Sequence, residues 1–271
     1  MKIGCFLSCE EFGPRELVEQ AKRAEAAGFH ALWLSDHYHP WNDEQGGFQL
    51  GVGTGEALNE HVPGARWPEA RVRREMLEEA VEVIRMLWQG GRRSHYGRHY
   101  TVENARIYDL PDRPPPIIVS GFGDEAVRMA AKIGAGFATT APDEHAIELY
   151  RSEGCRGPIQ AGTKVCFMAD EEEARKTVMR LWPNEGLPGE LSQVRPTPAH
   201  FEQATELVTA EHLMTPLGPD LERHVESLRQ YAAAGVEELF VQQILPDQDA
   251  FFGRWAEEVL PAFAGAGSGV R

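Results

Sequence analysis

Short apolar segments alternate with amphipathic helical stretches along most of this chain, and this alternation is the feature that most restricts its fold. The predicted strands are 2–8, 31–34, 48–52, 117–120, 137–140, 164–168 and 238–241. Strands that alternate with helices form parallel sheets. With 271 residues, 42% of them hydrophobic, the chain has the length of one α/β barrel. We therefore expect an α/β fold of the (β/α)8 TIM-barrel type that lacks one strand and its flanking helices.

The helices predicted between these strands have recognisable faces and ends. In the stretch 14–27, Leu17, Val18, Ala21 and Ala24 recur at helical spacing, and Gly28 follows. Similar patterns predict helices at 71–88, 124–133, 146–152, 171–181, 199–209, 220–234 and 251–263, a small hairpin within 96–108, and a proline-containing loop or lid at 183–198. We expect a single domain over residues 1–265 and a disordered tail at 266–271.

The segment between Leu34 and Phe48 breaks the alternation. It is a polar loop without a helical pattern, whereas parallel neighbours need a crossover of about a dozen residues or more, usually a helix. We expect a helix–strand–helix segment to be missing here, with strands 31–34 and 48–52 at an open or distorted side. An uncovered side favours association, so we expect a homodimer. A doubly wound open sheet is the alternative, but GVGTGE at 51–56 is a weak match to a dinucleotide fingerprint.

The net charge and the cysteines restrict the kinds of partner and the compartment that we expect for this protein. The formal net charge of −15 argues against nucleic acid or an anionic membrane surface as the main partner. The four cysteines lack CxxC pairing and are typical of reduced thiols. We expect a cytoplasmic protein that acts on a small-molecule substrate.

Polar residues gather where the predicted strands end, as barrel active sites require. Asp36 and His37 directly follow the strand 31–34, and a carboxylate beside an imidazole can orient it for proton transfer. Glu10 and Glu56 follow two other strands. Each has an ordinary alternative: Asp36 as a turn cap, His37 as a surface residue, Glu10 as a solvated loop acid and Glu56 as a helix-start carboxylate.

Lys164 and the pair His37 and His39 are two further candidates for ligand binding. Lys164 begins its predicted strand, where an edge lysine without a binding role is the simpler interpretation. The pair His37 and His39 invites a metal site, but the other histidines fall on predicted helices or loops, so no metal is expected.

Three motifs in order make the chain resemble the luciferase-like flavin and deazaflavin oxidoreductases. They are SCEEFGPREL at 8–17, SDHYHPW at 35–41 and LGVGTGEALNE at 50–60. The chain is similar to the coenzyme F420-dependent members, the group that includes F420-dependent glucose-6-phosphate dehydrogenase. The resemblance implies a (β/α)8 barrel and an F420-dependent oxidoreductase acting on CH–OH groups. Intact members carry a helix, a strand and a second helix between the second and third motifs.

The resemblance also implies roles for individual residues. His37 would be the general base and Trp41 would stabilise charge at the reacting centre, with Glu10 in support. Glu56 would serve the cofactor or act as an acid. The cofactor would further contact the residues Asp36, Asn59, Ser120 and Gly121.

Substrate and cofactor alternatives stay open at this point. Lys164 matches one basic residue of the sugar-phosphate enzymes and is the expected substrate-binding residue, but the stretch HLMT at 212–215 has no lysine or arginine. A small alcohol or its carbonyl counterpart is therefore expected instead of glucose-6-phosphate. The alternatives are an FMN-dependent monooxygenase and a non-catalytic remnant of the same fold.

Overall fold

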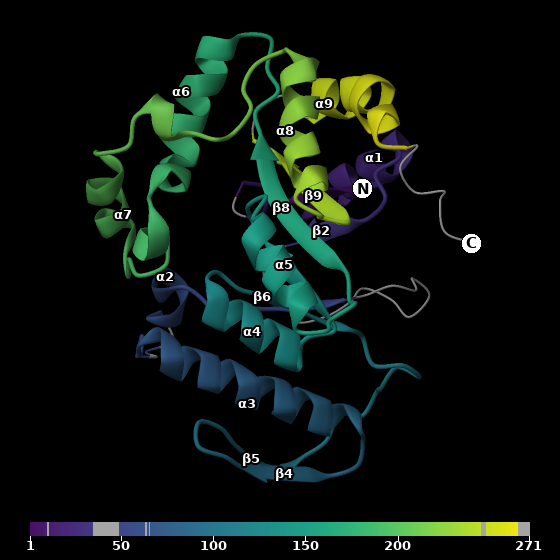
Figure 1. The fold of residues 1–271 in the computed structure, drawn as a ribbon, viewed down its shortest axis with the longest axis vertical. Helices are drawn as coiled ribbons and strands as arrows, with labels where there is room; N and C mark the ends of the chain where they lie inside the picture. The colour runs from purple at the N-terminus through teal and green to yellow at the C-terminus, as the bar shows by residue number, and fades with distance from the viewer. Residues whose placement is uncertain (10, 35–48, 63, 65, 245–247, 265–271) are drawn as a thin grey trace. The chain divides into compact units, whose positions relative to one another are not determined.

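The computed structural model describes residues 1–9, 11–34, 49–62, 64, 66–244 and 248–264. These residues form two compact units, drawn in Figure 1 and described here one at a time. Unit 1 contains 1–38, 139–147 and 159–271, and unit 2 contains 39–138 and 148–158. The predictions for Glu10, Asp36, His37 and Trp41, and those for the loop 35–48 and the tail 266–271, lie outside the described residues.

Unit 1 contains four parallel strands in the order β2, β1, β9, β8. Their bounds are Leu32–Leu34, Lys2–Leu7, Glu238–Gln243 and Ile159–Val165. The predicted strand 164–168 is wrong in position, because β8 ends where that strand was expected to begin. The segment IQAGTKV, with its glycine and polar residues, lacks a continuous apolar run, yet Ile159, Ala161 and Val165 are fully buried. Lys164 therefore lies at the carboxyl end of its strand.

A row of glycine and aromatic residues shows that this sheet is curled. Phe240 on β9 lies in register with Gly4 on β1 and Gly162 on β8. The Trp33 ring of β2 stacks on Phe240 with centroids 4.4 Å apart and reaches to 2.8 Å from where a Cβ on Gly162 would lie. Neighbouring strands are about 4.8 Å apart, so β2 and β8 would be about 14 Å apart in a flat sheet. The indole reaches Gly162 because the sheet bends.

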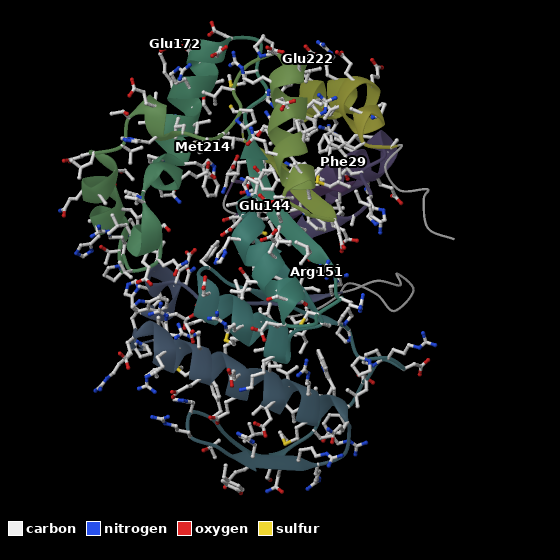
Figure 2. All side chains as sticks on the ribbon, viewed as in Figure 1. Phe29, Glu144, Arg151, Glu172, Met214 and Glu222 are labelled. Atoms are coloured by element: carbon white, nitrogen blue, oxygen red, sulfur yellow. The ribbon has the colours of Figure 1, made fainter. Side chains whose placement is uncertain are left out.

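The helices of unit 1 largely match their predicted ranges. They are α1 (Pro14–Ala27), α6 (Glu171–Leu181), α7 (Pro198–Thr205), α8 (Leu221–Ala233) and α9 (Gln248–Arg254), the last extended by a π turn at Trp255–Val259 and a 3-10 turn at Leu260–Ala262. Three more short 3-10 turns are η1 (Pro183–Gly186), η2 (Gly189–Ser192) and η3 (Ala210–His212). Asp170 and Asp220 cap α6 and α8 by accepting amide hydrogen bonds, including those of Glu172 and Glu222, both labelled in Figure 2.

The strand β2 departs from its prediction in burial. Four apolar residues in a row indicate a strand covered on both faces, but Leu32 and Leu34 are 44% and 41% exposed. Among the described residues, β2 pairs with β1 alone and nothing covers the face that carries the two leucines. Exposure of this strand is what the predicted loss of flanking helices produces.

Unit 2 contains three parallel strands in the order β3, β6, β7. Their bounds are Leu50–Val52, Ile117–Ser120 and Gly136–Thr139, the last residue of β7 being counted with unit 1. Its helices are α2 (Ala57–Glu60), α3 (Ala70–Trp88) and α4 (Asp124–Ile133), and α5 (Glu144–Ser152) contains residues of both units. A hairpin is present but begins three residues earlier than predicted, as β4 (Arg93–Tyr96) and β5 (Thr101–Ala105), which lie beside α3 in Figure 1.

Candidate functional site

Unit 2 brings together two loops that follow neighbouring strands. Val52 of β3 pairs with Val119 of β6, so the loop after Val52 begins beside Ser120. A Cβ on Gly53 would lie 3.7 Å from the Ser120 Cβ atom, which is ordinary contact. The candidate cofactor residues of this unit therefore share one set of strand ends, as parallel α/β folds require of a ligand site.

Glu56 ends the glycine-rich loop and immediately precedes α2. Its backbone is extended, its side chain is exposed, and the carboxylate makes no capping hydrogen bond to α2. The backbone oxygen of Glu56 instead accepts the amides of Asn59 and Glu60. The exposed Asn59 lies on the same short helix. Glu56 and Asn59 therefore lie on one short stretch of chain after the glycine-rich loop, and their roles stay predictions.

The Ser120–Gly121 turn is closely packed against the start of α4. A Cβ on Gly121 would lie 3.0 to 3.1 Å from atoms of Ala126, tighter than most real contacts. The Gly121 amide donates to the Ala138 carbonyl at 3.4 Å. A larger residue at this turn would have to push the start of α4 away, so glycine fits the close packing.

Unit 1 places a second group of polar residues at the ends of β8 and β9. Lys164 pairs in register with Gln242, which is 2% exposed. The Lys164 ammonium lies 2.7 Å from a Glu185 oxygen and 4.1 Å from the centroid of the Trp182 ring. The other Glu185 oxygen accepts a hydrogen bond from the Thr215 hydroxyl at 2.6 Å. Lys164 is therefore no free edge lysine, because a carboxylate and an aromatic ring hold it.

Glu11 joins this group from the loop after β1. One of its carboxylate oxygens accepts a hydrogen bond from the Trp182 indole at 3.0 Å and another from the Gln242 amide at 2.8 Å. The strand ends of β1, β8 and β9 are thus connected through side chains. We call the set Glu11, Lys164, Trp182, Glu185, Thr215 and Gln242 the strand-end cluster.

Burial raises the proton affinity of two groups beside the strand-end cluster. Burial, and to a smaller degree the Glu11 carboxylate, raise the pKa of the Cys166 thiol to about 12. Burial also raises the pKa of Tyr231, the hydrogen bond with Thr163 opposes this rise, and the Glu185 carboxylate adds to it. In both groups burial is the largest cause, and a carboxylate of the cluster is a smaller one.

Sequence reasoning missed four members of this cluster. Glu11 was passed over beside Glu10, and Trp182, Glu185 and Thr215 follow α6 or precede α8 in segments with no strand-end position. Glu185 within the predicted lid and Trp182 just before it were the available signal. Gln243, the last residue of β9, bonds both backbone groups of Phe167 at 3.0 Å and so extends the sheet.

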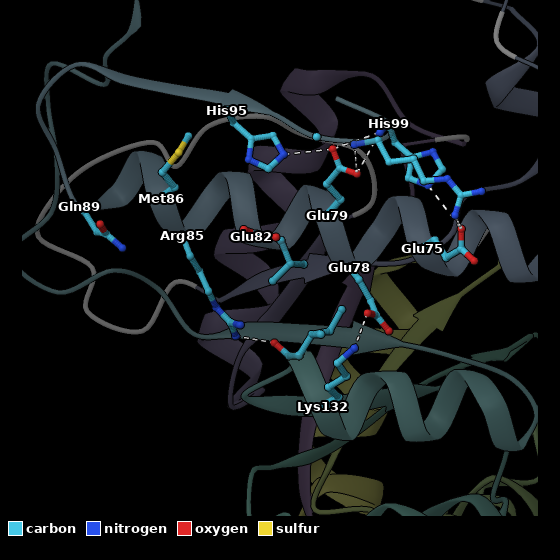
Figure 3. A pocket seen from close by; sticks show the side chains of 14 residues that line it. Glu75, Glu78, Glu79, Glu82, Arg85, Met86, Gln89, His95, His99 and Lys132 are labelled. Atoms are coloured by element: carbon cyan, nitrogen blue, oxygen red, sulfur yellow. Dashed lines mark hydrogen bonds and ion pairs between the residues drawn. The ribbon is translucent and has the colours of Figure 1, made fainter. Parts of the chain in front are cut away.

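A separate hollow of about 700 Å³ lies on the outer face of unit 2, between α3, α4 and the hairpin (Figure 3). Four glutamates lie among its fourteen lining residues, and Figure 3 shows Glu78 engaged with Lys132 and Glu79 with His95. Its α4 residues, Lys132 and Ile133, come from the end of that helix opposite the Ser120–Gly121 turn. Within the described ranges no group of three or more His, Cys, Asp or Glu residues is arranged to hold a metal ion.

Comparison with known proteins places the chain in a family. Residues 44–238 match the model of the luciferase-like monooxygenase family. The chain belongs to this family. Relatives named F420-dependent glucose-6-phosphate dehydrogenase are 29% identical in Nakamurella multipartita and 28% identical in Microbacterium testaceum, covering 96% of this chain and 96% and 97% of theirs.

Solved structures with the luciferase-like fold extend the comparison. An F420-dependent secondary alcohol dehydrogenase in complex with an F420–acetone adduct matches with a TM-score of 0.82 at 23% identity, covering 94% of this chain and 97% of that one. A coenzyme F420-dependent tetrahydromethanopterin reductase from Methanopyrus kandleri matches with a TM-score of 0.65 at 17% identity, covering 97% of this chain and 100% of that one. The predicted TIM-barrel-like fold, a mostly parallel curled sheet with helices, is confirmed.

The shortened form of the luciferase-like barrel is confirmed as well. The alignment with the Microbacterium relative runs over 328 positions, more than the 271 residues of this chain, so the relative carries segments that this chain lacks. Where they fall stays a prediction. Within the part of the chain that the structure describes, no helix is both long and apolar enough to cross a membrane.

Proposed function

We propose that this chain is an oxidoreductase that uses coenzyme F420 and acts on a small alcohol or its carbonyl counterpart. Support for the cofactor comes from the relatives named as F420-dependent enzymes and from the structural neighbour with an F420–acetone adduct. The observation that carries the proposal is that the glycine-rich loop after β3 and the Ser120–Gly121 turn after β6 lie side by side at neighbouring strand ends. Both loops present backbone where a planar ring system needs close approach.

We assign some of these residues to binding of the coenzyme and the others to reaction with the substrate. Glu56 and Asn59 hold the coenzyme by side chain, Ser120 and Gly121 by backbone. When bound, coenzyme F420 supplies the acceptor for the hydride that leaves the alcohol carbon as the carbonyl forms. His37 takes the hydroxyl proton, because a neutral imidazole oriented by Asp36 is a competent base near neutral pH. Trp41 and Glu10 complete the reacting end.

The substrate proposal departs from the names of the relatives. A phosphate ester needs cations, but Lys164 is neutralised by Glu185 and the stretch 212–215 contains no lysine or arginine. A small hydroxy or carbonyl compound fits these residues better than glucose-6-phosphate does. A cytoplasmic homodimer remains part of the proposal.

Cofactor titration tests the proposal. The full chain should bind coenzyme F420 more tightly than FMN when each is titrated and followed by its own absorbance and fluorescence. Glu56→Gln should weaken F420 binding about tenfold, the effect of losing one charged hydrogen bond. The matched control is Glu148→Gln, an exposed helical residue of unit 2. Tighter binding of FMN would favour a flavin monooxygenase, and binding of neither would favour a non-catalytic remnant.

A further inference from the structure

The strand-end cluster contains a lysine whose ammonium already pairs with a carboxylate. Lys164 lies where a barrel substrate site is expected, at the carboxyl end of β8. Its ammonium is 2.7 Å from Glu185, its side chain is 20% exposed, and that of Glu185 is 24% exposed. An ion pair shielded to this degree is less screened than a surface pair. An incoming anion would have to displace the carboxylate.

Glu185 is itself held in place from its other side. The Thr215 hydroxyl donates to its second oxygen at 2.6 Å, so both carboxylate oxygens are bonded. Trp182, three residues earlier, packs its ring against the Lys164 ammonium and donates its indole N–H to Glu11. The turn η1 therefore fixes the carboxylate on the lysine through contacts on both flanks.

The charge balance of the cluster is negative. Among these six residues, Glu11 and Glu185 contribute two carboxylates against one ammonium. Burial is the main cause of the raised pKa values of Cys166 and Tyr231, and the Glu11 and Glu185 carboxylates add to it. A phosphate or carboxylate would enter against this potential, whereas an uncharged substrate would not.

We propose that Glu185 determines the substrate specificity of the chain: by neutralising Lys164 it excludes anionic substrates and reserves the site for uncharged hydroxy and carbonyl compounds. Discrimination of this kind works by a repulsive element placed against the wrong ligand. The inference rests on the proposed function for its substrate site. Anion binding, however, needs no coenzyme, so it can be tested separately from F420 binding.

Calorimetric titration with inorganic phosphate is the first test. Wild type should show no binding at millimolar phosphate, whereas Glu185→Gln should bind it through the freed Lys164 ammonium. Adding Lys164→Met to that variant should abolish the binding. Glu185→Asp, which keeps the charge, and Glu190→Gln, an exposed acid of the neighbouring turn η2, should both behave as wild type.

Kinetics with the F420-loaded protein give the second test. Isopropanol and lactate share the reacting CH–OH group and differ in one carboxylate. Glu185→Gln should raise the ratio of kcat/KM for lactate to that for isopropanol by about tenfold or more. Phosphate binding by wild type overturns the proposal even if the variant fails to fold. So does a folded Glu185→Gln protein, checked by circular dichroism, that binds no phosphate.

Discussion

At the scale of single residues, we assign different roles to the neighbouring acids Glu10 and Glu11. Glu11 accepts hydrogen bonds from Trp182 and Gln242 through the same oxygen and so ties the loop after β1 to two other segments. A carboxylate that accepts these structural hydrogen bonds is poorly suited to transfer protons. Its neighbour Glu10 therefore remains the acid that we propose for the reacting end.

Replacing the proposed base should separate chemistry from binding. His37→Ala should reduce turnover about a hundredfold or more, because proton transfer loses its acceptor, while the affinity for coenzyme F420 stays nearly unchanged. Steady-state kinetics and a cofactor titration measure the two effects. His39→Ala is the matched control. Equal turnover in His37→Ala would remove His37 from the mechanism, and equal losses in both variants would reopen the metal hypothesis.

Sequence alone predicted which residues lie at strand ends. Ser120 and Gly121 lie at the end of a continuous apolar strand and Glu56 follows a run of glycines, whereas their roles come from the family resemblance and stay predictions. Glu185 and Thr215 were not predictable in this way. Glu185 contacts Lys164 and Thr215 contacts Glu185 across tens of residues of chain, and such contacts depend on how η1 packs, which no local pattern encodes.

At the scale of elements, one carboxylate organises the β4–β5 hairpin. Glu79 of α3 accepts the backbone amides of Arg98, His99 and Tyr100 and lies 3.1 Å from the His95 ring. Burial would raise the pKa of Glu79, but the Tyr100 amide, the His95 ring and the His99 amide outweigh it and lower that pKa to about 2. The hairpin turn is therefore fastened to the helix by charge-assisted hydrogen bonds.

This fastening predicts a dependence of stability on pH. Because the folded pKa of Glu79 lies below its ordinary 4.5, its stabilisation is complete above about pH 4.5 and is lost as the pH falls towards 2. Glu79→Gln should lower the urea midpoint at neutral pH, and its difference from wild type should shrink over that acid range. Gly97→Ala should also lower the urea midpoint at neutral pH, because the added Cβ would lie 1.8 Å from Glu79 Oε1.

The control for the hairpin prediction is Glu103→Gln, an exposed acid on β5 that accepts one hydrogen bond from Tyr96. It should leave the urea midpoint nearly unchanged. A difference between Glu79→Gln and wild type that persists unchanged into acid would show that the carboxylate acts by shape alone.

Element boundaries were predictable where a cap or a break marks them. The range of α1 is confirmed because Pro14 begins it and Gly28, at φ 89°, ends it. The ranges of α4, α6 and β6 are confirmed as well. The error at β8 has a physical cause, because Gly162 leaves room for a tryptophan from another strand and so breaks the apolar pattern that marks a buried strand.

At the scale of the whole molecule, the missing segment governs both stability and association. Within the described ranges, β2 and β3, which flank the predicted gap, each pair with one strand. Unpaired strand edges and uncovered apolar faces promote association. We therefore expect a dimer in light scattering, as the sequence pattern predicts.

Restoring the segment should test this directly. Inserting a helix–strand–helix segment from a family member after Gly47 should raise the melting temperature by several degrees and tighten F420 binding, because it covers the exposed face that carries Leu32 and Leu34. A glycine–serine insert of equal length is the control. A monomeric parent chain that melts cooperatively and binds F420 tightly would contradict the prediction.

The glycine–aromatic row of unit 1 limits how this protein can vary. A Cβ on Gly4 would lie 2.4 Å from the Phe240 ring, and one on Gly162 would lie 2.8 Å from the Trp33 ring. Neither glycine can therefore be replaced by alanine unless its aromatic partner changes as well. Natural variants and selected libraries should show the two pairs changing together, so that Phe240 and Trp33 become smaller only where the facing glycine has gained a side chain.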